Sequence, residues 1–250
     1  MHILLTNDDG INSDHLLALA NECIKRGHHI TMVAPLTQRS ANSHYVTISG
    51  PVEVFEQKDK PYPSFALDGT PADCTRIGIF NLVKDPVDLV ISGINNGWNA
   101  GRAIIYSGTV GAAREALLCN TRAIATSIDT AASSEMIEDC ASFTLDMAEK
   151  LCKDDTLPHD ALLNINYPAL TKDKVKAPVM AFVSTDIPDD RYTEYIAPRG
   201  QRYFFLANNY NFKCEEEGSD VNMLLKGHPA LSFVSIAEDR TIAQSDFLNK

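Results

Sequence analysis

Residues 3–10 read ILLTNDDG, a short apolar run that changes abruptly to amide, carboxylate and glycine residues. Short apolar runs are typical of strands that are buried on both faces of a parallel sheet. In open α/β sheets, ligands bind in the crevice beyond the carboxyl ends of such strands. The stretch therefore predicts the first strand of an α/β sheet, with Asp8 and Asp9 placed where a ligand would bind.

Short apolar runs alternate with helical patterns through the first two thirds of the chain. This alternation predicts an α/β fold, a mostly parallel sheet with helices on both faces. The predicted strands span residues 3–6, 30–34, 64–67, 88–92, 122–126 and 161–165. The predicted helices begin at the N-cap residues Ser13, Thr70, Thr109 and Ser133.

The pattern changes beyond residue 170, where strand-like runs are separated by charged loops. These runs span residues 179–184, 203–206 and 231–236, and a short final helix is predicted over 241–248. We therefore predict two parts, a catalytic domain of residues 1–170 and a smaller β-rich C-terminal extension of residues 171–250. The extension is expected to take part in oligomerisation.

The composition is that of an acidic globular protein. Among 250 residues, 22 are Lys or Arg and 33 are Asp or Glu, which gives a formal net charge of −11. This balance argues against binding to nucleic acid polymers or to membrane surfaces, because both favour a basic face. No apolar run approaches the ~20 residues of a membrane span, and the first residues lack a basic leader. With six cysteines scattered without paired spacing, we expect reduced thiols and a cytoplasmic location.

Asp8 and Asp9 are adjacent carboxylates that a turn at Gly10 can bring together. Two like charges held close are unfavourable unless a cation neutralises them, and hard oxygen ligands favour Mg²⁺, Mn²⁺ or Ca²⁺ over zinc. The run from Asn7 to Gly10 also suits an ordinary polar turn, but its position directly after a strand favours a cation site. The dinucleotide fingerprint GxGxxG is absent from this turn, which argues against a nicotinamide or flavin cofactor.

The loop of residues 93–101 is rich in glycine and asparagine and follows the fourth predicted strand. A loop of this length between a strand and a helix is uncommon unless it is functional. The amide oxygen of Asn95 can complete a metal shell without adding charge. Residues 106–111 then lead into the third predicted helix, whose first backbone N–H groups suit a phosphate. A plain N-cap by Thr109 is the alternative interpretation.

The second predicted strand is followed by Arg39 and Ser40, which can reach the same crevice. The hydroxyl of Ser40 adds a neutral oxygen, and the guanidinium of Arg39 can meet an anion. His44 in this loop is more typical of a surface histidine than of a ligand. Together, three strand ends supply carboxylates, amides, hydroxyls and a helix N-terminus, which predicts a metal-assisted phosphate site.

Five ordered motifs resemble those of the SurE family, the stationary-phase survival proteins that act as 5′/3′-nucleotidases. They are LLTNDDG at residues 4–10, VAP at 33–35 with Arg39-Ser40, GTPADC at 69–74, SGIN at 92–95 and YSGTV at 106–110. The likeness is strong over residues 1–128 and looser beyond them. It implies a Rossmann-like domain with a C-terminal extension exchanged between the subunits of a homodimer or homotetramer. It also implies hydrolysis of nucleoside monophosphates, with some action on short polyphosphate.

The resemblance implies one divalent metal ion per subunit, Mg²⁺ or Mn²⁺. The implied metal ligands are Asp8, Asp9, Ser40 and Asn95. Asp8 and Asp9 are also the catalytic candidates, because a carboxylate beside the metal can help to deprotonate the attacking water. The candidate phosphate and substrate contacts are Ser107, Gly108, Thr109, Asn99 and Arg39.

The general acid is expected in the C-terminal segment. Some family members carry histidines there that flank an aspartate. Asp239 is the candidate counterpart of that aspartate and a candidate general acid or base, whereas Ala237 and Ala243 stand near where the histidines would fall. The resemblance therefore does not name the general acid of this chain.

Three other classes of protein also place acidic residues after a first strand. An aspartyl-phosphate enzyme typically spaces its acids as Asp-x-Asp, whereas Asp8 and Asp9 are adjacent. A metal-dependent signalling module of receiver type needs only about half this length, and the matching lysine at a later strand end is missing. A non-catalytic binding or assembly protein is the third alternative. Absence of phosphatase activity with every divalent metal would favour it.

Overall fold

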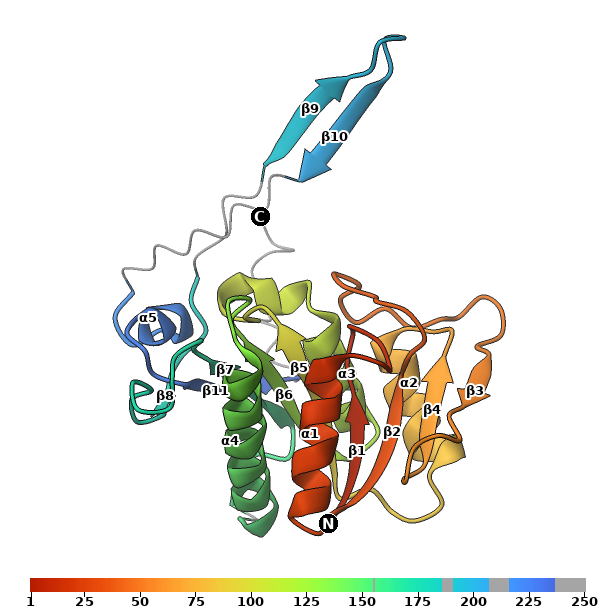
Figure 1. The fold of residues 1–250 in the computed structure, drawn as a ribbon, viewed down its shortest axis with the longest axis vertical. Helices are drawn as coiled ribbons and strands as arrows, with labels where there is room; N and C mark the ends of the chain where they lie inside the picture. Colours follow the sequence, from red (N-terminus) through yellow and green to blue (C-terminus); the bar gives the residue numbers. More distant parts are fainter. Residues whose placement is uncertain (155, 186–190, 207–215, 237–250) are drawn as a thin grey trace, which may run out of the picture.

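A nine-stranded sheet runs through the body of the molecule, in the order β3-β4-β2-β1-β5-β6-β7-β11-β8 (Figure 1). The computed structural model describes residues 1–154, 156–185, 191–206 and 216–236. The six neighbouring strands from β4 to β7 are all parallel, which confirms the predicted sheet. The strands of this sheet are β1 (His2–Thr6), β2 (His29–Pro35), β3 (Val54–Glu56), β4 (Ser64–Leu67), β5 (Leu89–Asn96), β6 (Arg122–Ile128), β7 (Ala161–Tyr167), β8 (Val179–Met180) and β11 (Ala230–Ser235).

Helices cover both faces of the sheet, as the alternating pattern predicts. Ile3 and Leu5 pack in one hydrophobic cluster with α1 and α4, whereas Leu4 packs on the opposite face with α2 and α3. Neighbouring residues of β1 thus point to opposite faces, and both faces are apolar because both are buried. Figure 1 shows α1 and α4 side by side on the near face. These helices are α1 (Asp14–Lys25), α2 (Pro71–Ile77), α3 (Gly108–Leu118) and α4 (Ser134–Lys153).

Two of the four predicted helix caps form as predicted. Thr70 and Asp73 form a reciprocal capping box at α2, and the side chain of Ser133 accepts from the backbone at the start of α4. Ser13 precedes α1, but its side chain makes no capping hydrogen bond. The prediction for Thr109 was wrong, because α3 begins at Gly108 and Ser107 is its N-cap. The hydroxyl of Thr109 is thereby free to point elsewhere.

The fourth predicted strand continues further than the sequence suggested. β5 does not end at Ser92 but runs to Asn96, so the first part of the predicted loop belongs to the strand. The ladder between β5 and β6 shifts register between Ser92 and Asn95, and pairing then resumes opposite Ser127. Such an irregularity re-aims the side chains that follow it. Asn95 is therefore presented by a strand end rather than by a free loop.

The region beyond residue 170 divides between the sheet and a separate ribbon. β11 pairs antiparallel with β7, β8 pairs with β11, and α5 (Asp220–Leu225) contacts β11. β9 (Tyr192–Ile196) and β10 (Arg202–Leu206) form an antiparallel ribbon that projects beyond the body of the molecule (Figure 1). The predicted helix over 241–248 lies outside the described residues. Within the described part, no helix has both the length and the apolar character needed to cross a bilayer.

Candidate functional site

The polar residues after β1 lie at the point where the order of the parallel strands reverses. From β1 the chain adds β2 and β4 on one side and then returns to add β5, β6 and β7 on the other. Crevices for ligands form at such a switch point, beyond the carboxyl ends of the two central strands. Asp8 and Asp9 follow β1, and Asn95 belongs to the end of β5. The fold therefore brings the two predicted acids beside the predicted amide.

A tight turn holds the two acids in place. The side chain of Asn7 donates to the carbonyl of Gly10 at 3.0 Å and accepts from its N–H at 3.1 Å. Gly10 has a φ of 105°, which side chains with a Cβ rarely adopt. Asn7 is fully buried, so this arrangement is fixed from inside the protein. The glycine that closes the motif is thus required by the backbone.

Asp8 is buried against the N-terminus of α3. The hydroxyl of Thr109 donates to its Oδ1 at 2.8 Å, and a Cβ at Gly108 would lie 3.1 Å from its Oδ2. Glycine at this position lets the first turn of the helix approach the carboxylate closely. Burial raises the pKa of Asp8 to about 6; the hydrogen bond from Thr109 opposes this shift, and the charge of Asp9 adds to it. The site therefore holds an uncompensated carboxylate that a cation would stabilise.

Asp9 connects the first strand to the loop after β2. The amide of Gln38 lies 3.4 Å from Oδ1 of Asp9 and donates to Oγ of Ser40 at 3.0 Å. Ser40 is exposed and thus lies at the mouth of the site. Burial raises the pKa of Asp9 as well. Its Oδ2 is buried and has no hydrogen-bond partner among the described residues.

Asn95 completes the group around the acids. Its Oδ1 lies 3.2 Å from the hydroxyl of Thr109, which also contacts Asp8, and its Nδ2 donates to the carbonyl of Gly97 at 2.7 Å. The latter bond turns the amide so that its oxygen faces the acids. Asp8, Asn95 and Thr109 thus share one hydrogen-bonded cluster, and Gln38 brings Ser40 beside Asp9.

Two predicted contacts, Asn99 and Arg39, have protein partners of their own, and a third predicted residue lies outside the described part of the chain. Asn99 is buried, and its Nδ2 donates to Oγ of Ser127 at 2.9 Å, within a network of buried amides. Arg39 forms an ion pair with Asp68 at 2.6 Å, and its Nε is buried without a hydrogen-bond partner among the described residues. Asp239 lies outside the described residues. Ser107 caps α3, because its hydroxyl oxygen accepts from the N–H of Val110 at 3.0 Å.

Gln38 is the site residue that the sequence did not single out. Its side-chain amide bridges Ser40, two positions along the chain, and Asp9, which is 29 positions away in the sequence. The second missed role belongs to Thr109, which bonds to Asp8 by its hydroxyl instead of capping the helix. The one available signal for Gln38 was its place between the second strand and the Arg39-Ser40 pair.

The donor set fits a hard divalent cation. Two carboxylates, one hydroxyl and one amide oxygen are the oxygen ligands that Mg²⁺ and Mn²⁺ prefer. The buried Oδ2 of Asp9, without a partner among the described residues, is an atom that a cation would satisfy. No cluster of three or more His, Cys, Asp and Glu that could hold a metal occurs in the described residues, which is expected where only two ligands are acids.

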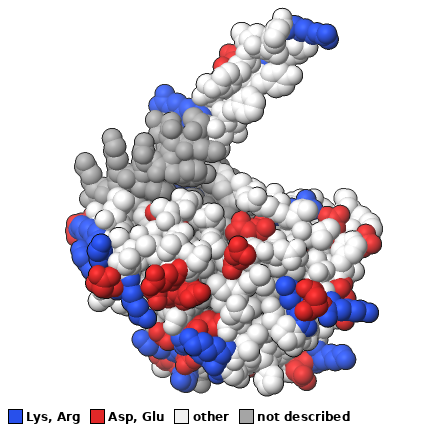
Figure 2. All heavy atoms as spheres, in the orientation of Figure 1, with Lys and Arg blue, Asp and Glu red and all other residues white. Residues whose placement is uncertain are grey.

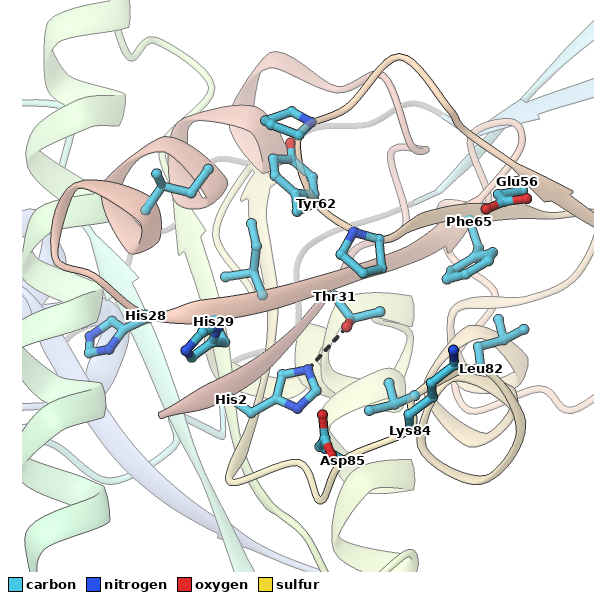
Figure 3. A pocket seen from close by; sticks show the side chains of 15 residues that line it. His2, His28, His29, Thr31, Glu56, Tyr62, Phe65, Leu82, Lys84 and Asp85 are labelled. Atoms are coloured by element: carbon cyan, nitrogen blue, oxygen red, sulfur yellow. Dashed lines mark hydrogen bonds between the residues drawn. The ribbon is translucent and has the colours of Figure 1, made fainter.

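A large cavity lies at the opposite end of the parallel strands, where β1 and β2 begin. It has a volume of about 760 Å³ and is lined by the starts of β1 and β2, by Tyr62 from the segment before β4 and by Phe65 of β4. In Figure 3, His2 points toward Thr31 at its floor, with Tyr62 and Phe65 on its walls. No predicted site residue lines this cavity, so cavity size does not locate the site.

Comparison with known proteins assigns the chain to a family. A family model described as "Survival protein SurE" matches residues 3–191, which is most of the chain. The chain belongs to the SurE family. A relative named "5'-nucleotidase SurE" from Clostridium botulinum (strain Langeland) is 40% identical over 224 residues, covering 88% of this chain and 87% of the relative. A protein of the same name from Pelobacter propionicus is 35% identical over 232 residues, covering 93% and 92%.

A solved SurE structure has the same fold over the whole chain. The crystal structure of the SurE protein from Aquifex aeolicus matches with a TM-score of 0.83 at 30% identity, and the match covers 100% of both chains. The α/β architecture predicted from the strand pattern is therefore also that of a SurE protein. The resemblance seen in five sequence motifs is confirmed.

Proposed function

We propose that this SurE protein is a divalent-metal-dependent 5′-nucleotidase that releases phosphate from nucleoside monophosphates. The observation that carries the proposal is the pair of adjacent carboxylates at the switch point of the sheet, Asp8 buried against the N-terminus of α3 and Asp9 half-buried beside it. A hard cation and a phosphate are the two partners that such an arrangement favours. The relatives that match the chain carry the name 5'-nucleotidase.

The proposed ligands of one Mg²⁺ or Mn²⁺ ion per subunit are Asp8, Asp9, Ser40 and Asn95. When bound, the metal supplies Lewis-acid stabilisation of phosphoryl oxygens and a more acidic water. Gly108 and Thr109 present the backbone N–H groups of the first turn of α3 to the phosphate. Ser107 keeps this turn in place by capping the helix. One of the two carboxylates accepts the proton of the attacking water.

Arg39 and Asn99 contribute at the margin of the site. The Nε of Arg39 has no partner among the described residues, so the guanidinium can donate a further hydrogen bond to a phosphate oxygen while Asp68 holds its other end. Asn99 anchors the loop after β5 through buried amides and keeps the mouth of the site in shape. Asp239 remains our candidate for the general acid or base.

The test is phosphate release by the purified protein from a panel of 5′- and 3′-nucleoside monophosphates and short polyphosphate. We expect release with Mg²⁺ or Mn²⁺ and none with chelator, and restoration when the metal is returned. The panel ranks the substrates at the same time. No release from any nucleotide with any divalent metal would overturn the proposal.

We also propose that the protein forms a homodimer or homotetramer through the region beyond residue 170. In the β9–β10 ribbon, Tyr195, Ile196 and Phe204 are each more than half exposed. Figure 2 shows that this ribbon carries few charged side chains, whereas acidic and basic groups are interspersed over the face beneath it. An isolated two-stranded ribbon is at best marginally stable in water, so a partner surface would stabilise it. A second copy of the chain offers such a surface.

Sedimentation of the full chain should give a mass of two or four subunits. Ile196 and Phe204 lie diagonally across one face of the ribbon, because Phe204 pairs with Glu194 and Arg202 with Ile196. Replacing both with Glu should lower the mass toward that of one chain, because charges in an apolar interface are unfavourable. A monomeric wild type, or an unchanged mass in the double variant, would contradict the proposal.

The cysteines that the structure describes fit a reducing compartment. Five of them are free, and four of these five are buried. Burial raises the pKa of the Cys23 and Cys140 thiols to about 12, which makes them unreactive. We propose the cytoplasm as the location, because free thiols persist there.

A further inference from the structure

A buried carboxylate outside the proposed ligand set joins the loop that carries Ser40 to two helices. Glu115 lies in α3 and is only 1% exposed. Its Oε2 lies 2.7 Å from Nε2 of His44, and its Oε1 pairs with Nε of Arg76 in α2. Burial by itself would raise the pKa of Glu115, but the hydrogen bonds from His44 and Arg76 bring that pKa below its ordinary value. The charged form of Glu115 is therefore held between two cationic or donating groups.

His44 belongs to the segment of residues 38–47, which we call the Ser40 loop. The loop is tied to the rest of the protein at both ends. The N–H of Arg39 donates to the carbonyl of Asp8 at 2.7 Å. At the other end, the hydroxyl of Thr47 donates to Asp73 at 2.6 Å. The middle of the loop depends on contacts made by Ser43 and His44.

The middle of the Ser40 loop is backbone-strained. Ala41 has a φ of 58° and Ser43 a φ of 53°, values that residues with a Cβ seldom adopt. Such conformations persist only where the surroundings hold them. Ser43 is held by two hydrogen bonds, from its hydroxyl to the carbonyl of Ile105 at 2.6 Å and from its N–H to the carbonyl of Tyr106 at 3.0 Å.

The strained turn lies directly on α3. A Cβ at Gly111 would lie 2.3 Å from the carbonyl oxygen of Ser43, so only glycine lets the loop come this close. Glu115 follows Gly111 by one helical turn on the same face of α3 and meets His44, the residue after Ser43. Gly111 thus leaves the space on α3 in which the turn at Ser43 packs, and the carboxylate of Glu115 holds the turn there through His44.

We propose that Glu115 is a positioning residue that, by holding His44, fixes the strained turn of the Ser40 loop and so presents Ser40 beside Asp9. Within the same loop, the side-chain amide of Gln38 links Ser40 to Asp9, because its Nε2 lies 3.0 Å from Oγ of Ser40 and 3.4 Å from Oδ1 of Asp9. The inference rests on the proposed role of Ser40 as a metal ligand. It adds three residues outside the proposed metal and phosphate contacts, namely Glu115, His44 and Arg76.

The test compares His44→Leu, which removes the donor, with His44→Gln, which keeps a side-chain N–H. The matched control is His2→Leu. His2 also makes one side-chain hydrogen bond, to Thr31 at 3.0 Å (Figure 3). It lies at the start of β1, whereas Asp8 and Asp9 follow the other end of that strand. Two quantities are measured without substrate: hydrogen exchange of the Ser43 amide, and Mn²⁺ affinity from the electron paramagnetic resonance signal of free Mn²⁺.

In His44→Leu we expect faster exchange of the Ser43 amide and about tenfold weaker Mn²⁺ binding, the size of effect that groups supporting metal ligands usually have. His44→Gln should recover much of both, and His2→Leu should match the wild type. Glu115→Gln, which keeps the shape and loses the charge, should weaken Mn²⁺ binding in the same direction. Unchanged exchange and Mn²⁺ affinity in His44→Leu, or an equal loss in His2→Leu, would overturn the inference.

Phosphate release is measured in parallel so that the two proposals fail separately. A wild type that binds Mn²⁺ but releases no phosphate would contradict the nucleotidase, while the exchange and Mn²⁺ comparison would still decide the role of Glu115. A wild type that releases phosphate, with His44→Leu unaltered in both quantities, would contradict the role of Glu115 alone.

Discussion

The Asp8→Asn variant is expected to lose phosphate release by about 10²–10⁴-fold, the range that a group acting in proton transfer typically contributes. The variant keeps the oxygen that accepts from Thr109 at 2.8 Å, so the contact with α3 survives. What it loses is the negative charge that the proposed metal ligand supplies. The measurement is initial phosphate release from the best substrate of the panel at saturating Mn²⁺, for wild type and variant side by side.

The free energy of unfolding of Asp8→Asn shows whether the variant is folded. We expect the substitution to raise this free energy at pH 7, whereas a substitution that damages the fold would lower it. Burial raises the pKa of Asp8 from an ordinary value of 3.8 to about 6. In the metal-free protein the native state therefore binds more protons than the unfolded state between these two values, so stability falls as pH rises through this window. Above the window the loss from Asp8 is about 3 kcal/mol, because one pKa unit corresponds to ~1.4 kcal/mol.

Asp8→Asn should therefore be more stable than the wild type at pH 7 in chelator, and this difference should disappear near pH 4. Urea unfolding at both pH values measures it. The result separates a lost charge from a lost fold, since a misfolded variant would be less stable at every pH. Full phosphate release by a folded Asp8→Asn protein would remove Asp8 from the site.

The architecture could be predicted because the information for it is local. Each parallel strand is buried on both faces, so each appears in the sequence as an apolar run. The polar residues that follow such a run mark the end of the strand. Asp8, Asp9 and Asn95 could thus be assigned to one edge of the sheet before their distances were known. Neighbouring strand ends meet in space even where they are far apart in sequence.

The corrections come from contacts that no local pattern contains. Ser107 and Thr109 are both good N-cap residues, and Ser107 caps because α3 starts two residues earlier than predicted, against Asp8. Gln38 reaches Asp9 across 29 positions, and His44 reaches Glu115 across 71. Periodicity and spacing carry no signal for pairs of this kind. Tertiary packing alone decides them.

The β9–β10 ribbon was the least predictable part for a related reason. Its first strand, β9, was not predicted, because Tyr192–Ile196 has neither a continuous apolar run nor a regular alternation of polar and apolar residues, and it follows a charged loop. Both of its faces are exposed in the single chain. A strand with no buried face in its own chain has no apolar pattern by which to predict it.

Gly93→Ala is expected to cost about 2–6 kcal/mol of unfolding free energy, the second large effect. The φ of Gly93 is 135°, a conformation whose strain for other residues is about 1–3 kcal/mol. A Cβ there would also lie 2.3 Å from the carbonyl oxygen of Thr126, and overpacking of this kind costs a further ~1–3 kcal/mol. Because Thr126 belongs to the neighbouring strand, backbone would have to move.

The control for this prediction is Gly27→Ala. Gly27 also has a positive φ, 76°, but a Cβ there would meet nothing within 4 Å. Gly27→Ala should therefore lose only the unfolding free energy that comes from backbone strain, about 1–2 kcal/mol. Urea unfolding of both variants separates strain from collision. Equal losses of unfolding free energy would mean that the backbones of β5 and β6 move apart at little cost beside Asn95. That result would contradict the rigid strand end on which the proposed metal site depends. A larger loss in Gly93→Ala, accompanied by weaker Mn²⁺ binding, would tie the packing of that strand end to the site itself.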